Sequence, residues 1–167
     1  EIAERTDFCC LLTHLNHDSC IDLHHEVTKG VTLLSSGRGC PRPVYAGSSP
    51  KTIISHLPKQ GILDYYQRFA VQLDEVGFAH DEQEFLSKMK KIKKQGYYFS
   101  NGEVDPNVSG LSVPIKFSSK EPPLALTVLG SRNRFEFVNL DKLIEVLHNN
   151  AALIEQKFIA LSSENAL

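Results

Sequence analysis

The sequence predicts an α+β domain, in which helices flank an antiparallel sheet and a long helix closes the carboxyl end. Two observations predict this class. Strand-like segments with alternating apolar residues occur as neighbours along the chain, at 8–27 and at 109–131, and turn or loop residues join each pair. Segments with helical spacing lie between and after these pairs. The length of 167 residues fits one domain, 1–167, with a single core.

Composition narrows the class of protein further. Hydrophobic residues make up 41% and charged residues 23%, as in ordinary soluble domains. The net charge of -2 gives no electrostatic reason to bind DNA or an anionic membrane directly, and no apolar run approaches the roughly 20 residues of a membrane span. The opening EIAERTD does not resemble a signal peptide and indicates the end of a helix. The four cysteines form no CxxC pair, which is typical of reduced thiols in a cytoplasmic protein.

In the first third of the chain, the sequence predicts strands. Residues 8–15 and 20–27 form a hairpin around the turn residues 16–19. The string VTLLS, at 31–35, predicts a third short strand. The string SGRGCPRP that follows breaks regular structure.

Helices are predicted in the middle of the chain. A short helix spans 50–57, with Ser49 as its N-cap and Pro50 at its first position. Pro58 interrupts it, and a second helix starts after Gly61. A third helix starts at Asp81, which forms a capping-box-like pair with Glu84, and ends at Gly96. The lysines of its KMKKIKK run predict a solvated helix face rather than a phosphate-binding patch.

The last third predicts a hairpin and a long helix. Residues 109–117 alternate, so the apolar side chains face one way and Gly110, Ser112 and Lys116 face the other. Pro114 indicates an edge position or a bulge, and 124–131 is the partner strand. A single apolar stripe over 140–161 predicts the long helix, which Asn139 can cap.

Two segments could form a ligand site. The N-terminus of a helix carries free N–H groups, and Ser48 and Ser49 add hydroxyls at that point, so it suits a carboxylate or phosphate. The loop 100–107 is rich in glycine, asparagine, aspartate and serine and could wall a pocket. The alternatives are an ordinary capped helix and an ordinary turn.

A metal site at the front of the chain is the weaker expectation. Cys20, Asp22 and His24 alternate along one strand and could hold Zn²⁺. A four-residue turn would place Leu15, Thr13 and Leu11 opposite them and His14 and His25 on the other face, which argues against a site. We therefore expect no metal. No nucleophile elbow, HExxH or phosphate-binding glycine motif is present, so we expect neither an enzyme nor a cofactor.

Four strings, in this order, resemble the effector-binding domain of the IclR family of bacterial transcriptional regulators. IAERTDF is similar to the family's lead-in, and GRGCPRPVYAGSSPKTIISHL to its "G…lPlhatA.GKaiLA.L" segment. KKIKKQGYYFSNGEVDPNVSGLSVPIKF is similar to "iR..Gya…gE…gv..iaaPV", and LALTVLGS to the "aalsvsGp" strand. The resemblance runs from about Ile2 to Phe158, and its most specific matches are Glu103 and the string from Val113 to Ile115.

The resemblance implies a GAF-like domain that binds a small effector, often a small organic acid or an aromatic acid, and that forms dimers or tetramers. It also implies a preceding winged helix-turn-helix domain that binds operator DNA and lies outside this sequence. The family binds its ligand with the first helix after the loop, the loop after the "Gya" string and the last two strands. Carried over, the ligand-binding positions are Ser48, Ser49, Ser100, Gly110, Thr127 and Leu129, with further lining from Val31, Leu34 and Arg42.

Several positions depart from the family pattern. Pro50 replaces a glycine, although Lys51 is kept; Leu129 removes a hydroxyl and Gly110 a thiol. The pocket is then expected to be larger or to take a ligand different from an oxo-acid. Arg42 stands where an apolar residue is usual and could pair with an anionic ligand.

We therefore expect the sensor domain of an IclR-type regulator. A small anionic or polar metabolite would bind between the helix at 50–57 and the segments 96–117 and 124–131. Two alternatives stay open: an oligomerisation or interaction module with a vestigial pocket, and a metal-binding protein that uses the His/Cys cluster at the front.

Overall fold

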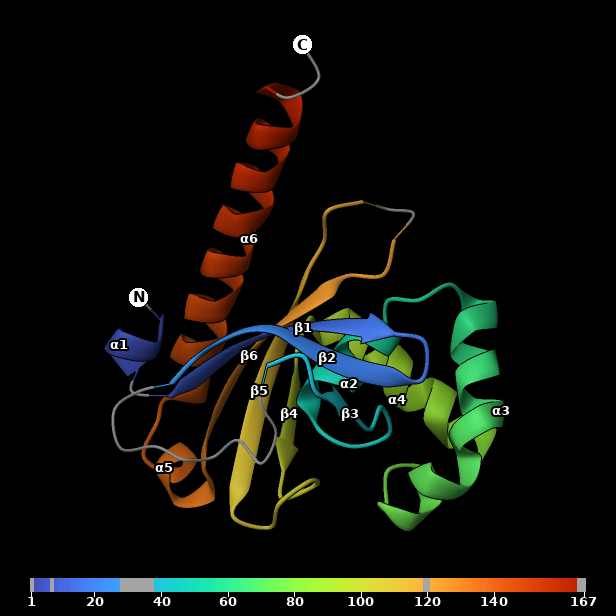
Figure 1. Ribbon diagram of the computed structural model, residues 1–167. Coiled ribbons are helices and arrows are strands. Elements are labelled where there is room, and N and C mark those ends of the chain that lie inside the picture. The colour runs from blue at the N-terminus through green and yellow to red at the C-terminus, as the bar shows by residue number, and fades with distance from the viewer. Residues whose placement is uncertain (1, 7, 28–37, 119–120, 165–167) are drawn as a thin grey trace.

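Six strands form one antiparallel sheet in the order β3-β2-β1-β6-β5-β4 (Figure 1). The computed structural model describes residues 2–6, 8–27, 38–118 and 121–164. The strands are β1 Cys9–Asn16, β2 Ser19–Glu26, β3 Pro41–Arg42, β4 Tyr98–Asn101, β5 Val108–Ile115 and β6 Leu124–Ser131. The helices are α1 Ile2–Thr6, α2 Ser48–Ile54, α3 Lys59–Glu75, α4 Glu82–Gln95, α5 Arg132–Glu136 and α6 Leu140–Glu164.

The predicted α+β class, its hairpins and the long carboxyl-terminal helix are confirmed. The strand predicted at 31–35 lies outside the described residues. The segment after it does not wholly lack regular structure, because Pro41 and Arg42 pair with β2 as the short strand β3. Helix α5 was not predicted, since its five residues are too short to show helical periodicity.

A β-bulge corrects the register predicted for the first hairpin. Thr13 lies opposite Asp22 as expected, but Leu12 rather than Leu11 lies opposite His24. The extra residue on β2 moves every later side chain to the other face of the sheet. His24 therefore leaves the face that Cys20 and Asp22 share, and His25 comes to lie opposite Leu11.

Two predicted helix starts are wrong by about two residues. Helix α2 begins at Ser48, with Gly47 as its N-cap at a φ of 91°, so Ser49 is not the cap. Only glycine adopts this φ without strain, which places the turn before the helix at Gly47. Helix α3 begins at Lys59, directly after Pro58, rather than after Gly61.

The predicted end of the first helix at 57 is also wrong, because α2 ends at Ile54. The predicted caps of α4 and α6 are confirmed. The Asp81 carboxylate accepts the backbone N–H of Glu84 at 2.7 Å at the start of α4. Gly96 ends that helix in the left-handed region, at a φ of 80°. The Asn139 side chain accepts the N–H of Lys142 at 3.0 Å at the start of α6. Side-chain caps and terminal glycines satisfy backbone groups that a helix end leaves open, so these signals could be read locally.

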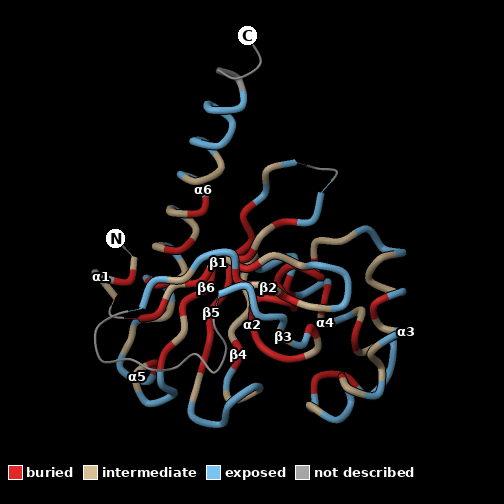
Figure 2. The backbone as a smooth tube through the Cα atoms, viewed as in Figure 1, coloured by how far each residue is buried: buried red, intermediate tan, exposed pale blue. Residues whose placement is uncertain are grey.

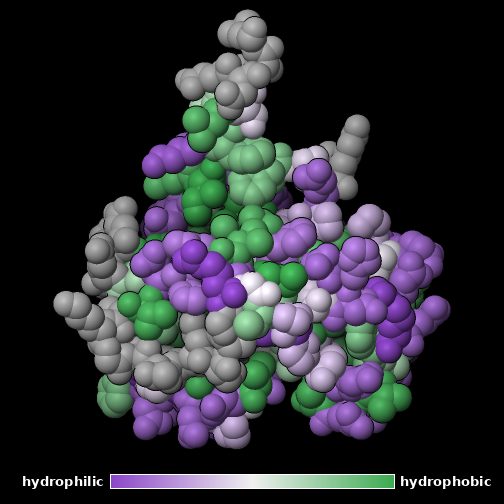
Figure 3. Space-filling view, viewed as in Figure 1, coloured by the Kyte–Doolittle hydropathy of each residue, from purple (hydrophilic) through white to green (hydrophobic). Residues whose placement is uncertain are grey.

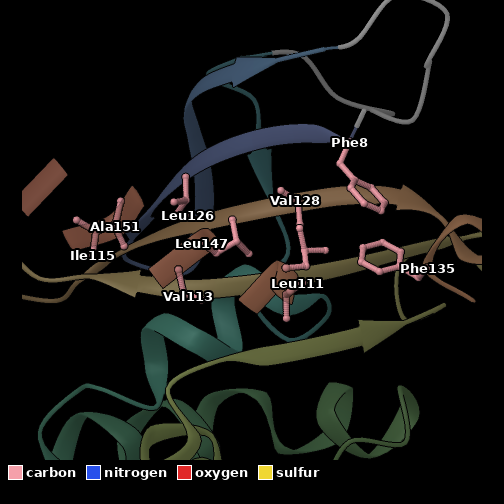
Figure 4. Packing of buried hydrophobic residues seen from close by; sticks show 10 residues of the cluster. Phe8, Leu111, Val113, Ile115, Leu126, Val128, Phe135, Leu147 and Ala151 are labelled. Atoms are coloured by element: carbon pink, nitrogen blue, oxygen red, sulfur yellow. The ribbon is translucent and has the colours of Figure 1, made fainter. Parts of the chain in front are cut away.

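One face of the sheet packs against α6 (Figure 4). Leu111, Val113 and Ile115 of β5 point to this face, as their alternation predicted, and meet Leu147 and Ala151 of α6. Pro114 lies beyond the end of β4, so its missing N–H leaves no ladder bond unmade on that side. The outer half of α6 extends past this core and is largely exposed (Figure 2).

The opposite face of the sheet is covered by α2, whose residues are all buried. Helices α3 and α4 pack on its outer side around a second apolar cluster with several aromatic rings, among them Tyr65 and Phe85 at a centroid distance of 5.9 Å. Helix α2 is therefore held between the sheet and this cluster. Its amino-terminal end meets the strands at the point where the candidate site forms.

Two histidines are expected to make the fold less stable in acid. Burial is the main cause that lowers the pKa of both His56 and His148, and the positive charge of Lys116 lowers both further. At His56 the charge of Lys93 also lowers the pKa, while the hydrogen bond to the Thr52 carbonyl opposes the shift. In the unfolded chain these two histidines have a pKa of about 6.5, so the unfolded state binds protons before the folded state does as the pH falls. We expect these two histidines to lower the free energy of unfolding as the pH drops through this value, whereas His80, whose pKa the hydrogen bond to Asp74 raises, contributes with the opposite sign.

Urea unfolding at pH values about one unit above and below that point measures the decrease. His56→Gln should reduce it. His17→Asn is the matched control, because His17 is exposed and asparagine tolerates its positive φ of 52°. An unchanged decrease in His56→Gln would contradict the assignment.

Candidate functional site

A cavity of about 90 Å³ lies between the start of α2 and strands β4, β5 and β6. We call it the hydroxyl cavity. Arg42 of β3 and Leu11 of β1 complete its walls, and the loop after β4 covers it with Glu103, Val104 and Asp105. Its lining residues are Leu11, Arg42, Gly47, Ser48, Ser49, Ser100, Glu103, Val104, Asp105, Val108, Ser109, Gly110 and Leu129.

Buried hydroxyl groups form a chain of hydrogen bonds beneath the cavity. The Ser112 Oγ donates to Ser48 Oγ at 2.8 Å and lies 2.7 Å from Thr127 Oγ1. The Thr127 Oγ1 lies 2.9 Å from Ser49 Oγ, which in turn lies 3.4 Å from Thr13 Oγ1. All five residues are buried. Since each hydroxyl can both donate and accept, the chain can reorient to serve a polar ligand group at Ser48 or Ser49.

Arg42 reaches the cavity from the edge of the sheet. Its Nη2 donates to Asp22 Oδ1 at 2.6 Å, and the same oxygen accepts the Thr13 hydroxyl at 2.8 Å. Asp22 is 1% exposed, so this ion pair holds a buried carboxylate. The Arg42 Nε is buried and has no hydrogen-bond partner among the described residues. A buried N–H group costs free energy unless an acceptor meets it, so this side chain, which lines the cavity, carries an unsatisfied donor.

The Glu103 carboxylate closes the start of α2. Its Oε2 accepts the backbone N–H of Gly47 at 2.9 Å and pairs with Lys51 Nζ, and its Oε1 accepts the Tyr98 hydroxyl at 2.7 Å. Lys51 is 1% exposed. Burial lowers the pKa of its ammonium, and the Glu103 charge opposes that shift. Burial first, and then Glu103, raises the pKa of Tyr98. A carboxylate of the chain itself therefore occupies the helix start at which we expected a ligand carboxylate.

The structure brings most of the predicted ligand-binding positions together. Arg42, Ser48, Ser49, Ser100, Gly110 and Leu129 line one cavity. Thr127 lies just beneath it, in the hydroxyl chain. Val31 and Leu34 lie outside the described residues. Whether these residues bind a ligand stays a prediction.

The expected enlargement of the pocket at Gly110 does not occur. A Cβ atom at this position would lie 2.7 Å from Leu129 Cδ2 and 2.7 Å from Ser48 Oγ. Leu129 therefore fills the space that the absent side chain leaves. These two departures from the family pattern compensate each other, and the cavity stays small.

The front cysteines and histidines are not gathered into a metal site. Within the described part of the chain, no group of three His, Cys, Asp or Glu side chains is placed to hold an ion. Asp22 is bound to Arg42 and Thr13, and His24 bonds to Glu26 at 2.7 Å in an exposed position. Burial raises the pKa of the Cys20 thiol to about 12, so the thiol is neutral in the structure described.

A known family matches nearly the whole chain. Residues 1–156 match the family described as bacterial transcriptional regulator IclR C-terminal. The chain belongs to the IclR family. The transcriptional regulator KipR of Bacillus subtilis, of the helix-turn-helix type, is 24% identical over 115 residues, which are 69% of this chain and 46% of KipR. The chain thus spans about half the length of this relative.

Solved structures of IclR proteins share the fold. IclR of Thermotoga maritima matches with a TM-score of 0.82 at 19% identity, over 93% of this chain and 63% of that one. An IclR homologue of Microbacterium hydrocarbonoxydans, solved with 4-hydroxybenzoate, matches with a TM-score of 0.79 at 19% identity. The match covers 95% of this chain and 64% of that one. At these identities the likeness establishes the fold alone. In the described residues no helix is long and apolar enough to cross a membrane.

The IclR resemblance picked out Glu103 without giving it a role. Its contacts reach Gly47 and Lys51, which are more than 50 residues away in the sequence. A signal was present: Lys51 lies in an apolar helix with no acidic residue within one turn, and a buried lysine needs a counter-charge. Ser112 was placed on the same strand face as Gly110 but was not predicted as a site residue, and the Thr13 hydroxyl was missed.

Proposed function

We propose that this domain senses a small polar metabolite, which binds in the hydroxyl cavity. The buried Arg42 Nε, which has no hydrogen-bond partner among the described residues, is the observation that carries this proposal, since Arg42 lines a cavity that also holds serine hydroxyls. A carboxylate or hydroxyl on the ligand would satisfy it. The complex of the Microbacterium relative with an aromatic acid supports small-molecule sensing in this family.

The size of the cavity favours a short ligand. A cavity of about 90 Å³ is smaller than the roughly 150 Å³ void that holds benzene. We therefore expect an organic acid of a few carbon atoms rather than a hydroxybenzoate. Glu103 is paired with Lys51, and Arg42, the one cation among the described lining residues, is already paired with Asp22. Asp105 adds a further carboxylate, so the ligand is expected to carry at most one carboxylate, directed at Arg42.

Ligand binding would act on the loop that covers the cavity. The loop after β4 carries Glu103, which ties it to α2 through Gly47 and Lys51. A ligand that binds one position of this loop better than another shifts the balance between them. The domain would in this way pass the presence of the ligand to its neighbours in the protein.

In the intact protein, we propose, this shift controls operator binding by a helix-turn-helix domain, in a cytoplasmic homodimer or homotetramer with no enzymatic role. Support for self-association comes from apolar side chains on the outer half of α6, among them Leu153 at 52% and Phe158 at 48% exposure. Green atoms gather over this helix in Figure 3. Light scattering on the full-length protein checks the oligomeric state. Operator-binding titrations with and without ligand check the control of DNA binding.

Calorimetric titration with a panel of short hydroxy and oxo acids, together with hydroxybenzoates, tests the site. We expect a short acid to bind the wild type and binding to weaken at least about tenfold in Gly110→Val, because the added side chain overlaps Ser48 Oγ and Leu129 Cδ2. Ser49→Ala, which removes one hydroxyl of the chain, should weaken binding less.

Gly61→Ala on α3 is the matched control, since its Cβ would have ordinary contacts away from the cavity. Circular dichroism and melting curves show whether each variant is folded. If no acid of the panel binds, or if Gly110→Val binds as the wild type does, the hydroxyl cavity is not the sensor. The module with a vestigial pocket would then be the better account.

A further inference from the structure

A second cavity, of about 350 Å³, lies between α4 and β4 and shares Glu103 with the hydroxyl cavity. We call it the lysine cavity. Lys51, Lys88 and Lys91 line it, and Glu103 is the only acidic residue among its described lining residues. Lys88 and Lys91 come from the KMKKIKK run, which we expected to be only a solvated helix face.

Two ammonium groups of this cavity meet at one aromatic ring. The Lys51 Nζ lies 3.9 Å from the centroid of the Phe78 ring, and the Lys88 Nζ lies 5.2 Å from it. The charge of Lys88 contributes to lowering the pKa of Lys51, so the two repel. Glu103 pairs with Lys51 and Glu84 with Lys88, at 2.8 Å for the latter pair, while Lys91 is exposed. The three lysines outnumber these two acids, so the cavity keeps an excess of positive charge.

Apart from Gln95, the remaining walls are aromatic and apolar. Phe78 and Tyr98 stand edge to face at a centroid distance of 5.9 Å, and Phe99 and Ile92 extend the surface. A volume of about 350 Å³ lies within the range of roughly 300–1,000 Å³ typical of small-molecule pockets. Flat apolar walls favour a ring, and excess lysine favours a negative group attached to it.

We propose that the lysine cavity is a second ligand site, which takes a small aromatic carboxylate. Its ring lies against Phe78 and Tyr98, and its carboxylate lies near the ammonium groups of Lys51 and Lys88, with Lys91 at the rim. The site is separate from the hydroxyl cavity and does not depend on the function proposed for it. Because Glu103 borders both cavities, a ligand in either one contacts the same carboxylate.

Nuclear magnetic resonance titration of the ¹⁵N-labelled domain with benzoate tests this. We expect saturable shifts of the amides at 88–92 and 97–99, both in the wild type and in Gly110→Val, which blocks only the hydroxyl cavity. In the double variant Lys88→Gln/Lys91→Gln the affinity should fall about tenfold, as expected for the loss of charge-assisted contacts.

Lys90→Gln/Lys94→Gln is the matched control, since it removes the same charge from exposed positions of α4 that do not line the cavity. It should bind benzoate as the wild type does. Equal weakening in the two double variants would reduce the effect to general surface charge and overturn the proposal. So would the absence of saturable shifts at these amides, or shifts that occur only at 47–49 and 109–110 and vanish in Gly110→Val; the last result would leave the hydroxyl cavity as the sole site.

Discussion

Glu103→Gln should destabilise the domain by about 3–5 kcal/mol, because it leaves the buried Lys51 ammonium without its counter-charge. The amide keeps the shape of the side chain, so the loss reports the missing charge. Urea unfolding followed by circular dichroism measures it. Glu75→Gln removes an exposed acid and should change the free energy of unfolding by less than about 0.5 kcal/mol.

The pH dependence of this variant gives a second, independent readout. Burial already lowers the pKa of Lys51, and removing Glu103 takes away the main charge that opposes this. In the variant, the folded state then binds fewer protons at Lys51 than the unfolded state does, up to the ordinary lysine pKa of about 10.4. The free energy of unfolding of the variant should therefore rise with pH, and its difference from the wild type should shrink. A deficit below about 1 kcal/mol at neutral pH would show that the pair does not hold the loop to α2.

Phe8→Ala should cost about 3–5 kcal/mol of folding free energy, as expected for a fully buried aromatic side chain. Phe8 is 1% exposed, and its ring lies 4.6 Å, centroid to centroid, from that of Phe135. Figure 4 shows the two rings facing each other at the end of the core. The ring also packs so closely on Gly130 that a Cβ atom there would overlap it.

Phe137→Ala is the matched control for this substitution. Phe137 is 88% exposed at the end of α5, so its loss should cost less than about 1 kcal/mol in the same urea experiment. A cost for Phe8→Ala no greater than that of the control would contradict the packing described at this end of the sheet.

Local signals allowed much of the fold to be predicted from the sequence. The alternation of Leu111, Val113 and Ile115 showed which face of β5 is buried, and the Asp81 and Asn139 caps marked helix starts within one residue. The bulge in β2 could not be predicted, because it changes the pairing of two strands without a proline or glycine to mark it.

The candidate site was predicted in part. The serines at 48 and 49 and the loop at 100–107 were expected to meet, and they line one cavity. The role of Glu103 was not found, since its partners come from a distant helix and only folding brings them within reach. Leu129 filling the space beside Gly110 is likewise a property of packing between two strands, which no single position reveals.

The most direct test of the central claim is a crystal structure of the domain with the tightest-binding short acid of the calorimetric panel. We predict the acid in the hydroxyl cavity, with its carboxylate within hydrogen-bond distance of Arg42 Nε and a second polar group on Ser48 or Ser49. An acid bound elsewhere, with the hydroxyl cavity unchanged from the one described, would contradict the claim.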